Sequence, residues 1–414
     1  MTIVVGAGLA GLTCAKVLAE AERPFLLLEA ARRPGGRVVS DHTPEGFTLD
    51  RGFQVLLDSY PAARRHLDYK ELGGGAFRSG AMFVGEGRPR CLENPLRNPL
   101  SVLGALGCGI LPFADQFRLL RVTWIAMNGS RDFDNLTTED FLRGCGFSEG
   151  FFLRFARPFF GGVLLDPDLQ TSAKFFLRYL RSFVTGRALL PARGIGGIAE
   201  QLVSHLPRQS MRYGARVHEL VYRNGRACGV RVDGGQSIEA FEIVLAVDEP
   251  AVCRLLVAGR SRPARGTAVH YLVADRAFYR GAWLCLPPRR KQSPVLHAAL
   301  LTNAVPGLAP PGSHLWSVTV LPDHPQATDA DFVAADVASW FGVASGELRP
   351  LAYTTVPYAV PEQLPAFEHR SAAWGELPTG VILAGDASCG ASIDAVMTSG
   401  EVAAKKVISS GALN

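Results

Sequence analysis

A glycine-rich turn close to the N-terminus constrains the fold of this chain more than any other feature of the sequence. Four residues with high strand propensity, Thr2 to Val5, come immediately before Gly6, Gly8 and Gly11, which fit the pattern G-x-G-x-x-G. An apolar helical pattern follows, and a second apolar run ends at Glu29, 18 positions after the last glycine. This order of strand, turn, helix, strand and acid predicts a βαβ unit that binds a dinucleotide.

Each part of this unit has a physical role. Gly6 allows a tight turn, Gly8 lets the backbone approach a pyrophosphate, and Gly11 lets helix and strand pack closely. The helix N-terminus offers unpaired N–H groups and partial positive charge to phosphates. Glu29 is expected to accept hydrogen bonds from a ribose diol and to repel a 2′-phosphate. The dinucleotide site predicted from the unit comprises Gly6, Gly8, Leu9, Ala10, Gly11, Glu29 and Ala30.

The residues after Glu29 indicate which dinucleotide binds. A Gly35-Gly36-Arg37 turn follows, and Asp50-Arg51-Gly52 comes a short way on. Here the chain resembles the flavoprotein superfamily of amine oxidases, protoporphyrinogen oxidases, phytoene desaturases and carotenoid isomerases. In that superfamily a Glu followed by a G-G-R turn binds FAD. The resemblance implies that Gly35, Gly36 and Gly52 lie along the cofactor and that Arg37 reaches its phosphates or the flavin.

The C-terminal region resembles the same superfamily. A short apolar run ends in Gly385-Asp386, and a helical pattern follows from Ile393. The resemblance implies that Asp386 holds the ribityl or pyrophosphate part of FAD. It also implies that the backbone from Ile393 to Ala395 faces the N1–C2=O edge of the flavin. That edge becomes negative on reduction, so a helix N-terminus stabilises it.

A third matching segment lies mid-chain, where alternating strand patterns begin at Val217, the residue expected to pack on adenine. Together the three segments imply an α/β fold, with a Rossmann-like FAD-binding domain of the glutathione-reductase type and a discontinuous α+β substrate domain. We predict that residues 1–55, 187–254 and 376–414 form the FAD-binding domain. Residues 56–186, mostly helical in pattern, and 255–375, with strand-like runs, are expected to form the substrate domain as a helical roof over a sheet. The substrate cavity would lie between the domains.

Composition limits the partners and the compartment. The net charge is +5, but the basic side chains are scattered, so we expect no nucleic-acid partner. The histidines lack metal-ligand spacing, and no metal site is predicted. The cysteines show no C-x-x-C pairing and the first strand begins at Thr2, so we expect reduced thiols, no signal peptide and a cytoplasmic protein.

The low-charge stretch from Pro99 to Ala114 is too short to span a bilayer. Two interpretations stay open for it. The stretch is either a buried helix-loop of the substrate domain or an apolar lip that dips into a membrane and admits a lipid substrate. The second interpretation would make the protein membrane-peripheral.

Two departures from the amine-oxidase pattern bear on function. Ser392 stands where those enzymes usually have a cage tyrosine, and the only lysine between Lys174 and Lys405 is Lys291, in a turn-like run. We therefore predict an FAD-dependent oxidoreductase that acts on a small hydrophobic substrate, with isoprenoids and carotenoids as candidates. The reaction would be hydride abstraction (desaturation) or redox isomerisation at flavin N5, with oxygen or a quinone as electron acceptor.

Two alternatives are kept: an amine oxidase that produces hydrogen peroxide, and a non-catalytic protein that binds flavin or lipid. No catalytic side chain is predicted. Four aromatic side chains lie in strands expected to border the cavity, and core packing is the expectation for each: His270, Tyr271, Tyr353 and Tyr358.

Overall fold

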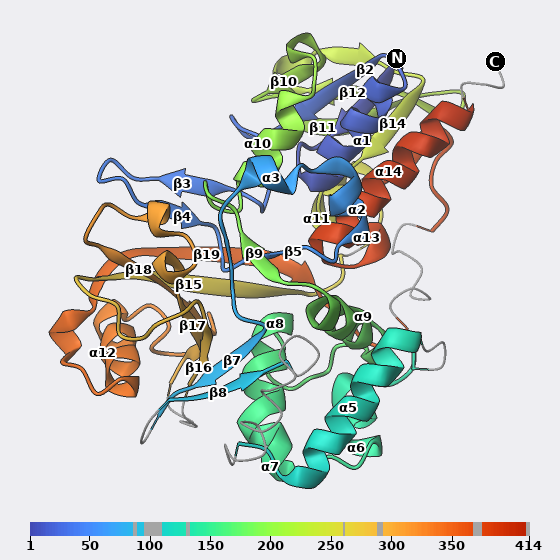
Figure 1. Ribbon diagram of the computed structural model, residues 1–414. Helices are drawn as coiled ribbons and strands as arrows, with labels where there is room; N and C mark the ends of the chain where they lie inside the picture. The colour runs from blue at the N-terminus through green and yellow to red at the C-terminus, as the bar shows by residue number, and fades with distance from the viewer. Residues whose placement is uncertain are drawn as a thin grey trace.

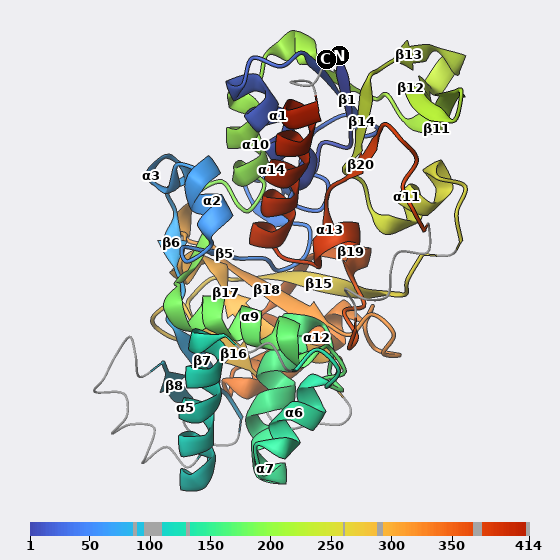
Figure 2. The ribbon, with the colours of Figure 1, turned by 90° about the vertical axis from the view of Figure 1, so that its right-hand side faces the viewer.

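The computed structural model describes residues 1–85, 89–94, 110–129, 133–259, 261–287, 293–366 and 375–410. Most of the stretch from Pro99 to Ala114, and Lys291, lie outside the described residues. Both chain ends lie in one region, above a second region built from a large sheet and a layer of helices (Figures 1 and 2).

A five-stranded parallel sheet forms the core of the region that carries the termini. Its order is β10 (Met211–Tyr213), β2 (Phe25–Glu29), β1 (Thr2–Val5), β14 (Glu242–Leu245) and β20 (Val381–Leu383). The strands come from three separate parts of the chain, and the first strand lies at the centre. Continuous apolar sequence is what a parallel strand covered on both faces requires.

Alternate residues of β1 face opposite layers. Val4 packs with the helices α1 (Leu9–Glu20), α10 (Gly197–Ser204) and α14 (Ile393–Ser410). Ile3 and Val5 pack on the other face, against the antiparallel sheet β11 (Val217–Arg223), β12 (Arg226–Val232) and β13 (Ser237–Glu239). Helices α1 and α14 lie side by side (Figure 2). The expected α/β architecture of this region is confirmed.

The second region contains a seven-stranded mixed sheet. Its order is β19 (Arg349–Pro361), β15 (Ala264–Ala274), β18 (His314–Val320), β17 (Val295–Leu300), β16 (Leu284–Leu286), β7 (Gly80–Phe83) and β8 (Arg90–Glu93). Helix α12 (Ala330–Trp340) covers one face, where Trp316 is fully buried. The opposite face is turned toward the parallel-sheet region and carries Val269 and Tyr271.

The helical layer beside this sheet consists of α5 (Phe113–Asn128), α6 (Thr138–Gly144), α7 (Glu149–Phe151), a π-helix (Phe152–Gly161), α8 (Gly162–Leu164) and α9 (Ala173–Thr185). Pro158 lies inside the π-helix, where its missing N–H disfavours regular α-helical hydrogen bonding. Phenylalanines dominate the core of this layer. Among the described residues, no helix combines the length and the apolarity needed to cross a bilayer.

The expectation that residues 56–186 are mostly helical is incomplete. The segment also contains β5 (Leu56–Leu57), β6 (Gly75–Ala76), β7 and β8. Strands β5 and β6 pair with β9 (Ala188–Leu190), far away in sequence. Strand β7 pairs with the distant β16, and β8 pairs with β7, so both extend the large sheet. The other short elements are β3 (Ser40–His42), β4 (Thr48–Asp50), α2 (Pro61–His66), α3 (Tyr69–Leu72), α11 (Glu249–Leu255) and α13 (Asp386–Cys389).

Candidate functional site

A cavity of about 930 Å³ lies between the two regions. Its walls come from all three segments of the parallel-sheet region and from the large sheet and its helical layer. Most of the residues expected to bind the cofactor line it: Gly6, Gly8, Leu9, Ala10, Glu29, Ala30, Gly35, Gly36, Arg37, Gly52, Val217, Gly385, Asp386 and Ile393. Segments distant in sequence thus converge on one hollow.

The glycine-rich turn has the close contacts that its sequence predicts. Gly6 has a φ of +101°, and a Cβ there would lie 2.6 Å from the carbonyl oxygen of Ala246. At Gly8 a Cβ would meet no atom within 4 Å, so the backbone is open to the cavity. Gly11 does not line the cavity; a Cβ there would lie 1.9 Å from the carbonyl oxygen of Gly6. Its role is close packing of α1 on β1.

Glu29 is the last residue of β2, and its carboxylate hydrogen-bonds the glycine-rich turn. One carboxylate oxygen accepts the backbone N–H of Ala7 at 2.7 Å, and the other accepts that of Ala31 at 2.7 Å. Each carboxylate oxygen has more than one lone pair, so these bonds leave acceptor capacity at the cavity wall. The position of Glu29 therefore fits the expected contact with a ribose diol.

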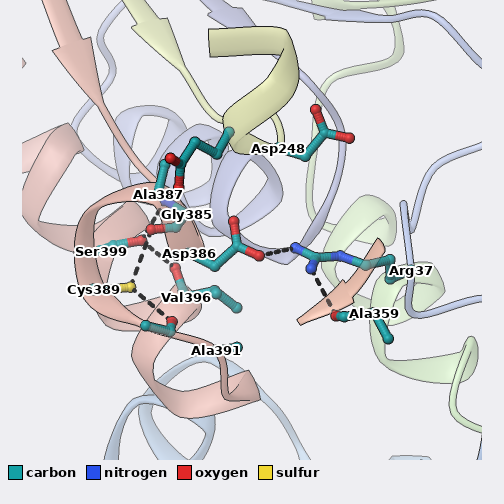
Figure 3. Close-up of polar contacts among 12 residues, drawn as sticks. Arg37, Asp248, Ala359, Gly385, Asp386, Ala387, Cys389, Ala391, Val396 and Ser399 are labelled. Carbon is teal, nitrogen blue, oxygen red and sulfur yellow. Dashed lines mark hydrogen bonds and ion pairs between the residues drawn. The ribbon is translucent and has the colours of Figure 1, made fainter. Parts of the chain in front are cut away.

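Asp386 and Arg37 meet at the cavity wall (Figure 3). Asp386 is 1% exposed, and its Oδ2 lies 2.6 Å from Arg37 Nη2. Arg37 Nη1 also donates to the carbonyl oxygen of Ala359 in β19 at 2.9 Å. Asp386 Oδ1 is buried and has no hydrogen-bond partner within the described part of the chain. An orphaned buried acceptor at the cavity wall suits a hydroxyl of a ribityl chain, so the residues fit FAD.

Arg37 thus has a structural role in addition to its predicted contact with the cofactor. The sequence predicts that it reaches the phosphates or the flavin, and here it joins the first segment to β19 and to Asp386. Its guanidinium also lies 5.5 Å from the ring centroid of Tyr358. Contact with the cofactor stays a prediction.

The start of α14 agrees only in part with expectation. Ile393 lines the cavity, but Ala395 does not, because it lies within the first turn and donates its N–H to Ser392 Oγ at 3.0 Å. The structure therefore does not support a backbone contact from Ala395 to the flavin. Ser392 itself lines the cavity. Cys389 lies nearby, but it donates to the carbonyl oxygen of Gly385 and does not line the cavity.

Of the four aromatic side chains singled out from the sequence, Tyr358 lines the cavity. Its hydroxyl is buried, and this burial raises its pKa above the ordinary value. His270 hydrogen-bonds the carbonyl oxygen of Ala327 at 2.7 Å, and Tyr271 donates to that of Asp50 at 2.7 Å. Neither lines the cavity, nor does Tyr353.

Sequence reasoning missed several lining residues, which come from the large sheet, the helical layer and two loops: His297, Thr319, Tyr179, Phe53 and Gln363. The Tyr179 hydroxyl lies 2.8 Å from Gln363 Oε1 and 2.6 Å from the carbonyl oxygen of Ala391. No local motif marks these residues, since their convergence depends on strand pairing and helix packing.

Comparison with known proteins identifies the family to which the chain belongs. The model of the family described as flavin containing amine oxidoreductase matches residues 9–408. The chain belongs to this family. The expected superfamily, the fold class, the FAD cofactor and the class of enzyme, an FAD-dependent oxidoreductase, are confirmed.

Solved structures resemble the chain over nearly its full length. They include an oxidoreductase from Methanosarcina mazei (18% identity, 99% of each chain covered, TM-score 0.72) and putrescine oxidase bound to putrescine (17% identity, 99% and 98% covered, TM-score 0.73). Cyclohexylamine oxidase from Brevibacterium oxydans is also similar (16% identity, 98% and 99% covered, TM-score 0.68). At these identities the likeness concerns the fold alone.

A local similarity to the L-amino-acid oxidase of Naja atra is higher, at 42% identity. It spans 66 residues, which are 16% of this chain and 13% of that protein. This short match agrees with the family and leaves the substrate open.

Proposed function

We propose that this flavoenzyme oxidises an apolar substrate, of which isoprenoids are the leading candidates, by desaturation or redox isomerisation. The observation that carries the proposal is the lining of the cavity on the substrate side. It is mainly apolar and includes Leu119, Leu120, Phe155, Phe159, Phe160, Leu180, Phe183 and Leu284. Among the described lining residues from 56–186 and 255–375, Glu93 is the single carboxylate, and none is a lysine.

When bound, FAD would supply a two-electron acceptor for the hydride of a substrate C–H bond. The proton of the adjacent carbon would pass to solvent, and oxygen or a quinone would later take the electrons. The phenylalanine-rich wall binds the hydrocarbon and excludes water from it. The glycine turn, Glu29 and Asp386 would hold the cofactor along the parallel sheet. The positive N-terminus of α14 at Ile393 favours negative charge developing beside it.

Amine oxidation is the rival function, and the family description together with the similar folds of two amine oxidases favours it. Ser392 at the cavity wall, in place of a cage tyrosine, weighs against it. An amine would also be charged near neutral pH, and burying that charge in an apolar lining is costly unless it is paired.

The deciding experiment compares two substrate panels with the FAD-loaded protein. We expect isoprenoid hydrocarbons and alcohols of increasing chain length to bleach the flavin anaerobically, and putrescine and cyclohexylamine to yield no hydrogen peroxide. Rapid peroxide production with either amine would overturn the proposal. FAD that dithionite reduces, but that no candidate substrate bleaches, would point to a non-catalytic flavin- or lipid-binding protein.

We also propose a peripheral membrane contact through α5. Its exposed apolar side chains follow one face of the helix, at intervals of four and three residues: Phe113, Phe117, Leu120, Trp124 and Met127. Trp124 is 66% exposed and Phe117 is 65% exposed. Leu120 also lines the cavity, so this face continues to the cavity wall. Such a helix suits a bilayer interface and would place the cavity beside dissolved lipid.

Co-sedimentation with phosphatidylcholine vesicles that contain phosphatidylglycerol tests this contact. Phe117→Ser combined with Trp124→Ser should reduce vesicle binding at least about tenfold, because two interfacial aromatic anchors are lost. Phe241→Ser is the matched control, since Phe241 is 75% exposed in the region that carries the termini. Equal vesicle binding by all three proteins would refute the membrane contact.

A further inference from the structure

Two buried polar side chains face the cavity from neighbouring strands of the large sheet. His297 on β17 is 5% exposed, and Thr319 on β18 is 1% exposed. The two residues are direct partners in the antiparallel pairing, and both line the cavity. Side chains directly opposite in such a pair have Cβ atoms about 5 Å apart. One small group in the cavity could therefore contact both.

Neither side chain has a hydrogen-bond partner. Both ring nitrogens of His297 and the Oγ1 of Thr319 are buried and unpaired within the described part of the chain. Buried polar atoms in folded proteins are almost always hydrogen-bonded, and unpaired ones need an explanation. Three unpaired atoms on adjacent strands at a cavity wall point to a group that the cavity receives.

The surroundings of His297 are apolar and keep its ring uncharged. The Phe53 ring lies edge-on at 5.2 Å between centroids, and at Gly162 a Cβ would lie 2.8 Å from His297 Nδ1. Any residue other than glycine at position 162 would place its Cβ against the imidazole ring. Burial lowers the pKa of His297 to about 4, so the imidazole is neutral near pH 7 and offers one donor and one acceptor.

The pair lies away from the cofactor end of the cavity. Arg37, beside Asp386, bonds to β19, and the strand order runs β19, β15, β18, β17. Neighbouring strands are about 4.8 Å apart, so β17 lies roughly 14 Å from β19 and β18 roughly 10 Å. Thr267 on β15, which lies between β18 and β19, and Tyr358 on β19 line the same wall. The pair therefore faces the part of the cavity that takes the substrate.

We propose that His297 and Thr319 form a specificity subsite that hydrogen-bonds an uncharged oxygen function, a hydroxyl or a carbonyl, of an otherwise apolar substrate. This inference rests on the proposed function, because it assumes that an apolar substrate occupies the cavity. It narrows the substrate class from hydrocarbons to oxygenated lipids. A pure hydrocarbon would leave all three polar atoms unpaired, and a site built to pair them discriminates against such a ligand.

The test compares ligands that differ only by the oxygen. Geraniol and farnesol are each paired with the hydrocarbon of the same skeleton that lacks the hydroxyl, and binding is followed by the shift of the flavin absorption spectrum. The wild type should bind each alcohol at least about tenfold more tightly than its hydrocarbon. His297→Leu and Thr319→Val, both near-isosteric, should bring this ratio close to one and leave hydrocarbon affinity intact.

Thr355→Val is the matched control, because Thr355 is exposed on β19 of the same sheet and does not line the cavity. It should keep the wild-type ratio. If His297→Leu fails to fold, Thr319→Val alone decides. A ratio unchanged in both variants, or near one in the wild type, overturns the subsite but leaves the apolar-substrate proposal standing. Failure of both members of every pair to bind, with flavin reduction by amines, overturns both proposals.

Discussion

Alanine at two glycines of the N-terminal turn should separate folding from cofactor binding. At Gly11 the new Cβ would lie 1.9 Å from the carbonyl oxygen of Gly6, and both groups are fixed between α1 and β1. Backbone atoms cannot rotate away, so we expect Gly11→Ala to destabilise the protein by about 3 kcal/mol or more. At Gly8 the new Cβ meets nothing within 4 Å and enters the cavity.

At Gly8 we therefore expect the opposite result: a small loss of stability and a large loss of FAD affinity. Its φ of −73° and ψ of 178° suit alanine, and the cost to the apoprotein is about 1 kcal/mol, since alanine is a poorer N-cap than glycine. The methyl group would keep a pyrophosphate from the turn. Losing two hydrogen bonds to a charged group, at about 1.5 kcal/mol each, weakens FAD binding by about 3 kcal/mol, or roughly a hundredfold.

Denaturant unfolding of the flavin-free proteins and FAD titration by quenching of flavin fluorescence give the two quantities. Gly8→Ala should lose only about 1 kcal/mol of unfolding free energy and bind FAD roughly a hundredfold more weakly. For Gly11→Ala we expect the larger change in the free energy of unfolding. If Gly8→Ala bound FAD within about threefold of the wild type, the turn would not approach the pyrophosphate and the reasoning would fail.

Two further outcomes follow from buried groups. Asp386→Asn should weaken FAD binding about tenfold in the same titration, because the buried carboxylate beside Arg37 becomes a neutral amide; unchanged affinity would remove Asp386 from the cofactor site. The pKa of His297 is about 4 in the folded protein against 6.5 ordinarily, so its contribution to stability is present above pH 6.5 and is lost as the pH falls toward 4. Between pH 7.5 and pH 5 the wild type should lose about 2 kcal/mol more unfolding free energy than His297→Leu, and parallel pH profiles would contradict this.

Most residues predicted to bind the cofactor line one cavity, and the sequence could indicate them because they belong to local motifs. The glycine turn, Glu29 and the Gly385-Asp386 pair each depend on residues close together in the chain, where turn geometry and strand ends follow from residue type. The predicted contact from Ala395 finds no support in the structure, because Ser392 Oγ accepts the N–H of Ala395.

The substrate side was far less predictable. His297 and Thr319 become neighbours only through the register of β17 on β18, and a shift of one residue would turn both to the other face. Strand β7 joins the large sheet through β16, about 200 residues away in sequence, and carries β8 with it, so the helical pattern around these strands dominated the expectation. The contact of Arg37 with Asp386 likewise joins residues at opposite ends of the chain.

The close approach of α1 and α14 has a consequence for biosynthesis. A Cβ at Gly400 would lie 2.1 Å from the carbonyl oxygen of Ala10, so the first helix of the chain packs directly on the last. During translation the apolar side of α1 therefore stays uncovered until α14 has been synthesised. A chain cut short before α14 would lack this cover and Ile393 at the cavity wall, so we expect such a product to bind FAD poorly.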